Sequence, residues 1–120
     1  MSDVTLIAAG VGITPIRAML EDLPSHVNVN VIVRATRSDD IVHAEEMKTL
    51  VAQREGRYHE VVGSRETVRL DDGVLESLVP NIRANDVFVC GPAGFTDAIV
   101  ASARRLGIPH EHLHHESFTF

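Results

Sequence analysis

Short runs of apolar residues alternate along the chain with segments whose apolar residues recur every three or four positions. Runs of this length are typical of buried strands, and the wider spacing is typical of one face of a helix. Strands are expected at residues 4–9, 27–35, 58–63, 87–90 and 113–118, and helices at about 15–23, 41–54, 71–79 and 94–106. The alternation predicts an α/β fold: a doubly wound, five-stranded parallel sheet in the order 3-2-1-4-5, with helices on both faces.

The first two helical segments carry signals for where each helix begins. Pro15 suits the first turn of a helix, where its missing N–H costs no hydrogen bond, and Thr14 is a candidate N-cap. The Ser-Asp-Asp sequence at residues 38–40 offers capping side chains and negative charge to the second helix. That helix should run to about Arg54, with Ile41 on its apolar face.

Length, composition and charge exclude several classes of protein. The 120 residues suffice for one domain over residues 1–120, and 44% apolar with 23% charged residues is ordinary for a globular chain. A formal charge of −6 argues against nucleic acid or an anionic membrane as a partner, because either favours a basic surface. The apolar runs are too short to span a bilayer and no secretion leader precedes them. A cytoplasmic chain that does not insert in a membrane is therefore expected.

Cysteine and histidine give no indication of a metal site. Cys90 is the only cysteine, which excludes an intrachain disulfide and any four-cysteine zinc or iron–sulfur site. His110, His112 and His114 alternate along the chain and could share one face, as three zinc ligands do. We interpret them as surface histidines near a domain junction, and no metal is expected.

Two glycines directly follow the first predicted strand. Gly10 permits a tight strand-to-helix turn, and Gly12 allows a phosphate to approach the backbone, where free N–H groups and the helix dipole attract an anion. By itself this pattern fits a plain strand–helix turn equally well. Pro15 replaces the third glycine of the usual dinucleotide fingerprint, and Thr36 and Arg37 follow the second strand where an acidic residue usually holds the ribose.

Three motifs occur in an informative order: G-V-G-I-T-P at residues 10–15, V-C-G-P-A-G at 89–94 and H-E-S-F at 115–118. Together they resemble the C-terminal NAD(P)-binding domain of the ferredoxin–NADP reductase superfamily, over essentially the whole chain. Within that superfamily, G-V-G-I-T-P-I-R-A-M-L and R-A-T-R-S-D-D look closest to ferric reductases and NADPH-oxidase-like flavoproteins.

The resemblance implies a binding site for the nicotinamide half of NADP(H). In the superfamily the first turn holds the pyrophosphate, a threonine lies near the nicotinamide, and the C-G-P turn lies across the nicotinamide ribose. Cys90 would then lie beside the site of hydride transfer, as a small polarizable side chain and not as a nucleophile. The residues implied for these contacts are Gly10, Val11, Gly12, Ile13, Thr14, Pro15, Cys90, Gly91 and Pro92.

The resemblance also implies a contact to the 2′-phosphate of NADP(H). NADP-preferring members place a serine and an arginine after the third strand, which Ser64 and Arg65 match. A guanidinium fork and a hydroxyl suit a doubly charged phosphate, and Arg37, beside Thr36, could add a second cation. Arg69 is interpreted as a solvated loop residue. NADP(H) is therefore expected in preference to NAD(H).

The end of the chain matches the superfamily's flavin-facing aromatic residue. There, an aromatic ring near the C-terminus stacks on the flavin and is displaced by nicotinamide. Phe118 matches that ring and Phe120 is the alternative, while Glu116 lies two residues before Phe118. The catalytic residues implied are Cys90, Glu116 and Phe118. A phenylalanine that merely packs against the sheet would show the same pattern.

The implied reaction is hydride transfer from nicotinamide to FAD, which then passes electrons to heme, ferric iron, oxygen or an iron–sulfur protein. Superfamily members carry an FAD-binding barrel before this domain, and its arginine-rich flavin motif is not found here. The expected partner is therefore the FAD-binding domain of the same parent protein. Any heme-bearing membrane helices would lie further upstream, which would place the parent at the cytosolic face of a membrane. The alternatives are a nucleotide-binding or sensing domain without redox chemistry, and an unrelated doubly wound domain in which the motifs coincide by chance.

Overall fold

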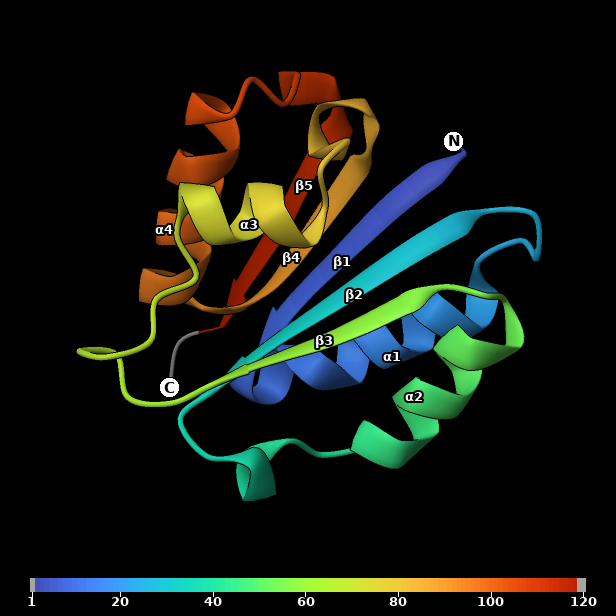
Figure 1. Cartoon of the computed structure of the whole chain (residues 1–120), viewed down its shortest axis with the longest axis horizontal. Helices are drawn as coiled ribbons and strands as arrows, with labels where there is room; N and C mark the ends of the chain where they lie inside the picture. Colours follow the sequence, from blue (N-terminus) through green and yellow to red (C-terminus); the bar gives the residue numbers. More distant parts are fainter. Residues whose placement is uncertain (1, 119–120) are drawn as a thin grey trace.

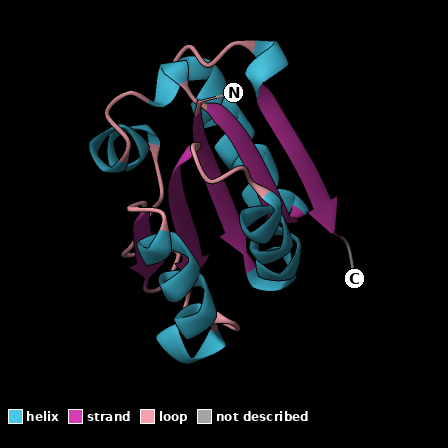
Figure 2. Cartoon of the chain, turned by 90° about the vertical axis from the view of Figure 1, so that its right-hand side faces the viewer, coloured by secondary structure: helices cyan, strands magenta, loops and turns pink. Residues whose placement is uncertain are grey.

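A five-stranded parallel sheet forms the centre of the computed structural model, which describes residues 2–118. All strand arrowheads point the same way (Figure 2). In spatial order the strands are β3 (Arg57–Val62), β2 (Asn28–Ala35), β1 (Asp3–Ala9), β4 (Asp86–Pro92) and β5 (Leu113–Phe118). The predicted fold class and strand order are confirmed.

Helices cover both faces of the sheet (Figure 1). The helices are α1 (Ile13–Asp22), α2 (Ala44–Gln53), α3 (Asp72–Leu78) and α4 (Ala93–Arg105). Helices α1 and α2 pack on one face, and α3 and α4 pack on the other. Because both faces are covered, the strands bury side chains on both sides, which explains why the sequence shows continuous apolar runs.

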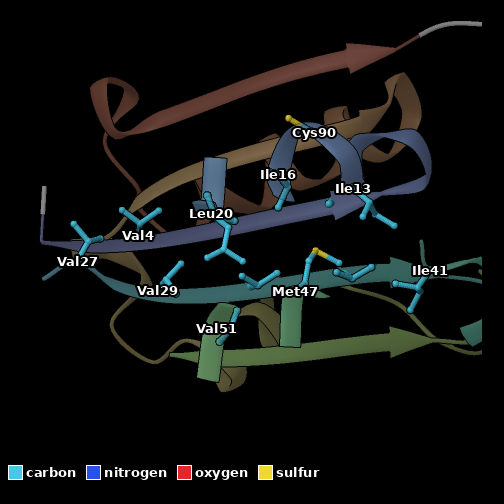
Figure 3. Packing of buried hydrophobic residues seen from close by; sticks show 14 residues of the cluster. Val4, Ile13, Ile16, Leu20, Val27, Val29, Ile41, Met47, Val51 and Cys90 are labelled. Carbon is cyan, nitrogen blue, oxygen red and sulfur yellow. The ribbon is translucent and has the colours of Figure 1, made fainter. Parts of the chain in front are cut away.

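The first core lies between the sheet and helices α1 and α2. Figure 3 shows Ile16 and Leu20 of α1 facing Met47 and Val51 of α2 across this layer. The sheet contributes the predicted stripe of alternate valines, and all of its members are buried: Val27, Val29, Val31 and Val33. The predicted facing of this strand is thus confirmed.

The second core lies beneath α3 and α4. Leu75 of α3 and Ile99 of α4 pack against Ile7 and Val89 of the sheet. Near the amino-terminal ends of β1 and β4, the Thr5 hydroxyl donates a buried hydrogen bond of 2.8 Å to Asn85 Oδ1. This bond satisfies two polar side chains that would otherwise destabilise an apolar layer.

The predicted N-cap of the first helix is wrong. Helix α1 begins at Ile13, Gly12 occupies the N-cap position, and no side chain caps the helix. Thr14 is therefore already inside the helix and exposed. The reason is that a short 3₁₀ helix, Gly10–Gly12, leads directly into α1. Pro15 lies in the first turn, as predicted.

The predicted start of the second helix is also wrong. Residues Ser38–Asp40 form a separate 3₁₀ turn, and α2 begins only at Ala44 without a side-chain cap. Ile41 between them has an extended backbone, with φ −85° and ψ 101°, and is buried in the first core. Ile41 is spaced from Ala44 and Met47 as residues on one face of a helix are. Its side chain nevertheless reaches the core from the segment that connects the 3₁₀ turn to α2.

Gly12 lies against the turn that ends β4. A Cβ atom on Gly12 would lie 2.1 Å from the Cys90 carbonyl oxygen and 2.8 Å from the Gly91 nitrogen. The space left by the missing side chain is thus filled by the protein's own backbone, whereas the sequence suggested that a phosphate fills it. Gly10 has a left-handed conformation, φ +56°, which favours glycine at that turn.

We expect Gly12→Ala to destabilise the chain, because the added methyl group cannot fit against the Cys90 backbone. The loss in free energy of unfolding should be about 3 kcal/mol, the upper end for overpacking. Gly94→Ala is the matched control, since nothing lies within 4 Å of its Cβ and it occupies a helix. The control should be neutral or more stable by up to about 1 kcal/mol. Urea unfolding measures both, and equal stabilities would contradict the close contact.

Candidate functional site

A large cavity lies at the carboxyl ends of the strands. Its volume is about 780 Å³, within the range of small-molecule sites. Gly10 after β1 and Pro92 at the end of β4 lie at one part of its wall. The strand order reverses between these two strands, and in open α/β sheets this switch point is the usual place for a ligand.

The structure brings some of the predicted cofactor-binding residues to this cavity. Gly10, Thr36, Arg65 and Pro92 line it, and three of these belong to different strand ends. Arg65 comes from the segment after β3. The ends of β1, β2 and β4 thus meet in one site, as the sequence suggested.

Other residues of the first turn lie outside this cavity. Ile13 is fully buried in the first core and Gly12 is buried beneath the turn. Val11 is exposed to 48%, and Thr14 is exposed on α1. The turn therefore contributes Gly10 to the cavity wall, while Ile13 anchors the turn in the core.

Two residues expected near the 2′-phosphate have partners within the protein. The Ser64 hydroxyl lies 2.7 Å from Thr67 Oγ1 and accepts a hydrogen bond of 3.3 Å from the Thr67 amide. Arg37 forms an exposed ion pair of 3.5 Å with Asp39 and does not line the cavity. Both side chains are exposed, so these contacts are weak and exchangeable.

Sequence reasoning missed several cavity residues, above all basic ones. Besides Arg65, the cavity is lined by Arg34, Arg69 and Arg105. Arg69, which the sequence predicts to be a solvated loop residue, is exposed but also lines the cavity. A usable signal exists for Arg34, because it is a charged residue at the end of the otherwise apolar run V-I-V-R-A.

An aromatic side chain forms part of an apolar section of the cavity wall. Phe95, in the first turn of α4, lines the cavity together with Ile99 and Leu70. A Cβ on Gly91 would lie 2.7 Å from the Phe95 ring, so the glycine allows the ring to pack against the turn. The cavity thus pairs an apolar surface with cations, which suits a ligand with a flat ring and phosphate groups.

Asp72 and Arg105 form a bidentate ion pair beside this wall. Arg105 Nε donates to Asp72 Oδ2 at 2.8 Å, and a terminal nitrogen donates to Oδ1 at 2.9 Å. The pair joins the start of α3 to the end of α4. The Arg105 hydrogen bonds lower the pKa of Asp72 to about 2, with a smaller contribution from Ser102.

A second, smaller hollow lies on the α1 side of the sheet. Its volume is about 130 Å³, and its lining includes Met19, Phe88, Cys90 and Glu116. Burial raises the pKa of the Cys90 thiol, and the nearby Glu116 carboxylate raises it further. The thiol is therefore neutral at pH 7, which fits a packing role and disfavours a nucleophilic one.

The three residues expected to be catalytic lie on one face of β4 and β5. Cys90 pairs with Glu116 in the sheet, and Pro92 pairs with Phe118. Phe118 is half-buried and packs against the first core, whereas Glu116 is exposed. Phe120, the alternative ring, lies outside the described residues.

Comparison with known proteins identifies the family. A family model described as "Oxidoreductase NAD-binding domain" matches residues 6–101, which include both glycine turns and the whole of the large cavity's β1, β2 and β4 walls. The chain belongs to this family of oxidoreductase NAD-binding domains. The prediction of a ferredoxin-reductase-like NAD(P)-binding domain is confirmed.

Curated relatives of this NAD-binding domain include electron-transfer proteins. It is 31% identical over 120 residues to a flavohemoprotein of Vibrio cholerae. The match covers 96% of this chain and 30% of the relative. It is 31% identical over 121 residues to the ferredoxin reductase component of 3-ketosteroid-9-alpha-monooxygenase of Mycolicibacterium smegmatis, covering 98% of this chain and 34% of the relative. The chain thus spans about a third of the length of these relatives.

A solved structure supports the same relationship. The flavohem-like FAD/NAD-binding domain of nitric oxide dioxygenase from Vibrio cholerae superposes with a TM-score of 0.79 at 29% identity. The match covers 96% of this chain and 50% of that chain. This NAD-binding domain therefore corresponds to about half of a solved unit that is described as binding both FAD and NAD.

The described part of the chain shows neither a metal-binding cluster nor a membrane-spanning helix. Among residues 2–118, no group of three or more histidine, cysteine or acidic side chains is placed to hold a metal ion. In the same part of the chain, no helix combines the length and apolar character that crossing a bilayer requires. The alternating histidines thus do not converge on a common point.

Asp72 should titrate well below an ordinary aspartate. Its pKa is lowered in the folded chain, so its contribution to stability is present above about pH 4 and is lost as the pH falls towards 2. Replacing Arg105 by glutamine should return the Asp72 pKa towards 3.8, as measured by carboxyl NMR titration. Arg104→Gln, one position earlier on α4, serves as the charge-matched control and should leave that pKa low. An unchanged pKa in R105Q would show that the ion pair is not its cause.

Proposed function

We propose that this chain is the NADP(H)-binding module of a flavin-dependent oxidoreductase, and that it presents the nicotinamide to FAD held by a partner domain. The observation that carries this proposal is the large cavity at the switch point of the sheet. The cavity extends from the turn at Gly10 to the side chains of Arg65 and Arg69. The family assignment supports a nicotinamide nucleotide as the ligand.

The positions of the residues that line the cavity support one orientation of the bound nucleotide. Gly10 and Pro92 lie where the strands β1 and β4 end, and the Cys90 hollow lies on the same strand end. Arg65 and Arg69 lie in the segment after β3, and Arg34 at the end of β2 contacts that segment. We therefore assign the nicotinamide to the Pro92 end, the pyrophosphate to the Gly10 turn and the adenosine to the Arg65 end.

The arginines support NADP(H) over NAD(H). Arg65 and Arg69 are exposed on the cavity wall and present guanidinium groups that suit a 2′-phosphate. Ser64 lies beside them, and its bond to Thr67 is exchangeable at the surface. Arg37 and Thr36 remain candidates for a second contact, with Thr36 on the wall and Arg37 beyond it. The excess of arginines over aspartates on the cavity wall favours the additional phosphate.

The chemistry assigns supporting roles to residues on β4 and β5. When bound, the nicotinamide supplies a hydride to FAD, so the protein has to align the two rings and exclude water. Cys90 offers a small neutral side chain at the ring site, since burial keeps its thiol protonated. Phe118 is held by the sheet beside Pro92 and can shield the flavin-facing side. Glu116, exposed next to both, is positioned to face the partner.

The open surface over β4 and β5 is our candidate contact for the FAD-binding domain. His114 and Glu116 are exposed there, although they lie on the same side of the sheet as the first core. The Vibrio cholerae structure, half of which this chain covers, is described as binding FAD and NAD, and this supports an FAD-binding partner domain. The named relatives support heme or an iron–sulfur protein as electron acceptors, with ferric iron and oxygen as further candidates.

The proposed cofactor preference predicts a specific pattern of nucleotide binding. The 120-residue chain should bind NADPH more tightly than NADH, as measured by isothermal titration calorimetry. Arg65→Gln should weaken NADPH binding about tenfold and NADH binding less than about twofold, because the lost hydrogen bonds go to the 2′-phosphate. Arg104→Gln, which removes a charge outside the cavity, should bind both as the wild type does. Equal affinities of the wild type for the two nucleotides would contradict the preference for NADP(H).

The proposed division of labour predicts that this chain alone has no reductase turnover. Purified protein with NADPH and ferricyanide should show no catalysed reduction, with or without added FAD, because the flavin is held mainly by the partner domain. Joining the chain to its FAD-binding domain should restore turnover. Substantial ferricyanide reduction by the isolated chain would contradict this proposal. Nucleotide binding without turnover in the joined protein would favour a sensing domain.

A further inference from the structure

Arg34 holds the segment after β3 by its backbone. One terminal nitrogen donates to the carbonyl oxygens of Ala35 and of Val61, the latter at 3.2 Å. The other terminal nitrogen donates to the carbonyl oxygens of Gly63 at 2.8 Å and Val68 at 2.9 Å. A single half-buried guanidinium therefore joins the ends of β2 and β3 to the loop that follows.

The loop at residues 63–68 closes on itself around this guanidinium. The Val68 amide donates to the Ser64 carbonyl oxygen at 2.8 Å, and the Gly63 amide donates to Ala35 at 3.0 Å. Gly63 has φ +148°, and a Cβ there would lie 2.4 Å from Val68 Cγ2. The loop is thus compact, and Arg34 contacts the carbonyl at each of its two ends.

This loop carries the groups assigned to the 2′-phosphate. Ser64 and Arg65 lie within it, and Arg69 follows directly after Val68. Arg34 itself lines the cavity, but its two terminal nitrogens are directed at protein carbonyls. Its chemical contribution is therefore to orient Arg65 and Arg69, which leaves direct phosphate contact to those side chains.

We propose that Arg34 is a positioning residue that sets the discrimination between 2′-phosphorylated and unphosphorylated adenine nucleotides, by fixing the loop at residues 63–68. The inference rests on the proposed function, because it presupposes that the adenosine lies at the Arg65 end of the cavity. A planar guanidinium reaches four carbonyls from one position, whereas a lysine ammonium offers three donors from one atom. Lysine should therefore preserve the loop only in part.

Two nucleotide probes separate positioning from general stability. Adenosine 2′,5′-bisphosphate and 5′-AMP differ only in the 2′-phosphate, and calorimetry on the 120-residue chain gives the affinity ratio. Arg34→Met should reduce the preference for the bisphosphate about tenfold, while the affinity for 5′-AMP changes less than about twofold. Arg34→Lys should lie between Arg34→Met and the wild type. A role confined to the stability of the sheet would lower both affinities by the same factor.

A second variant approaches the same loop without touching Arg34. Gly63→Ala should push Val68 away and displace the loop, because the new Cβ meets the Val68 side chain and the backbone angle disfavours any residue but glycine. It should lose the same preference for the bisphosphate. Arg104→Gln should keep it. This variant keeps the proposal testable if Arg34→Met fails to fold, as circular dichroism would show.

The outcomes distinguish this inference from the function on which it rests. A wild-type chain that binds neither nucleotide overturns both. A wild type that prefers the bisphosphate, with Arg34→Lys and Gly63→Ala both retaining the full ratio, overturns the role of Arg34 alone. Loss of the ratio in these variants and in Arg65→Gln, with 5′-AMP binding intact, establishes Arg34 as the residue that positions the loop.

Discussion

Gly12 lies against the backbone of Cys90 and Gly91, and the geometry of the site depends on that close approach. It brings two turns that are almost eighty residues apart in the sequence into direct contact. As a result, Gly10 and Pro92 form one continuous part of the cavity wall at the point where the strand order reverses. A side chain at position 12 would push the two turns apart and thereby change this part of the cavity wall. Glycine is thus required at position 12 for packing, and it affects the cavity only because this packing holds the two turns together.

The chain has a net charge of −6, yet it places four arginines around one cavity. Two of them are committed to the protein: Arg34 binds backbone carbonyls, and Arg105 binds Asp72. These bonds hold two opposite sides of the cavity, the segment after β3 and the α3–α4 pair. Arg65 and Arg69 remain exposed on the wall, where a phosphate can reach them. The cavity lining carries these four arginines against two aspartates, Asp40 and Asp71, so a local excess of positive charge, and not the overall charge, favours an anionic ligand here.

Strand β4 and the turn at its end contribute to two sites at once. Pro92 at its end lines the large cavity, whereas Cys90 faces the smaller hollow beside Glu116 of β5. The nucleotide site and the open surface proposed for the FAD-binding domain thus meet at the end of one strand. Hydride transfer requires two rings in contact, so under the proposed function the nicotinamide and the flavin would meet beside the Cys-Gly-Pro turn.

The sequence by itself determined the order of strands and helices, the parallel sheet and the turns at Gly10 and Pro92, because burial on both faces requires continuous apolar runs and tight turns require glycine and proline. It did not determine where the second helix begins: Ile41 is spaced like a helical residue, but it reaches the core from extended backbone. Nor did it identify Arg34, because a charged residue in a strand reveals its role only when the carbonyls of distant segments converge on it. Local periodicity and turn chemistry are properties of neighbouring residues, which a sequence displays directly. The cavity wall is built from contacts between residues that only the folded sheet brings together.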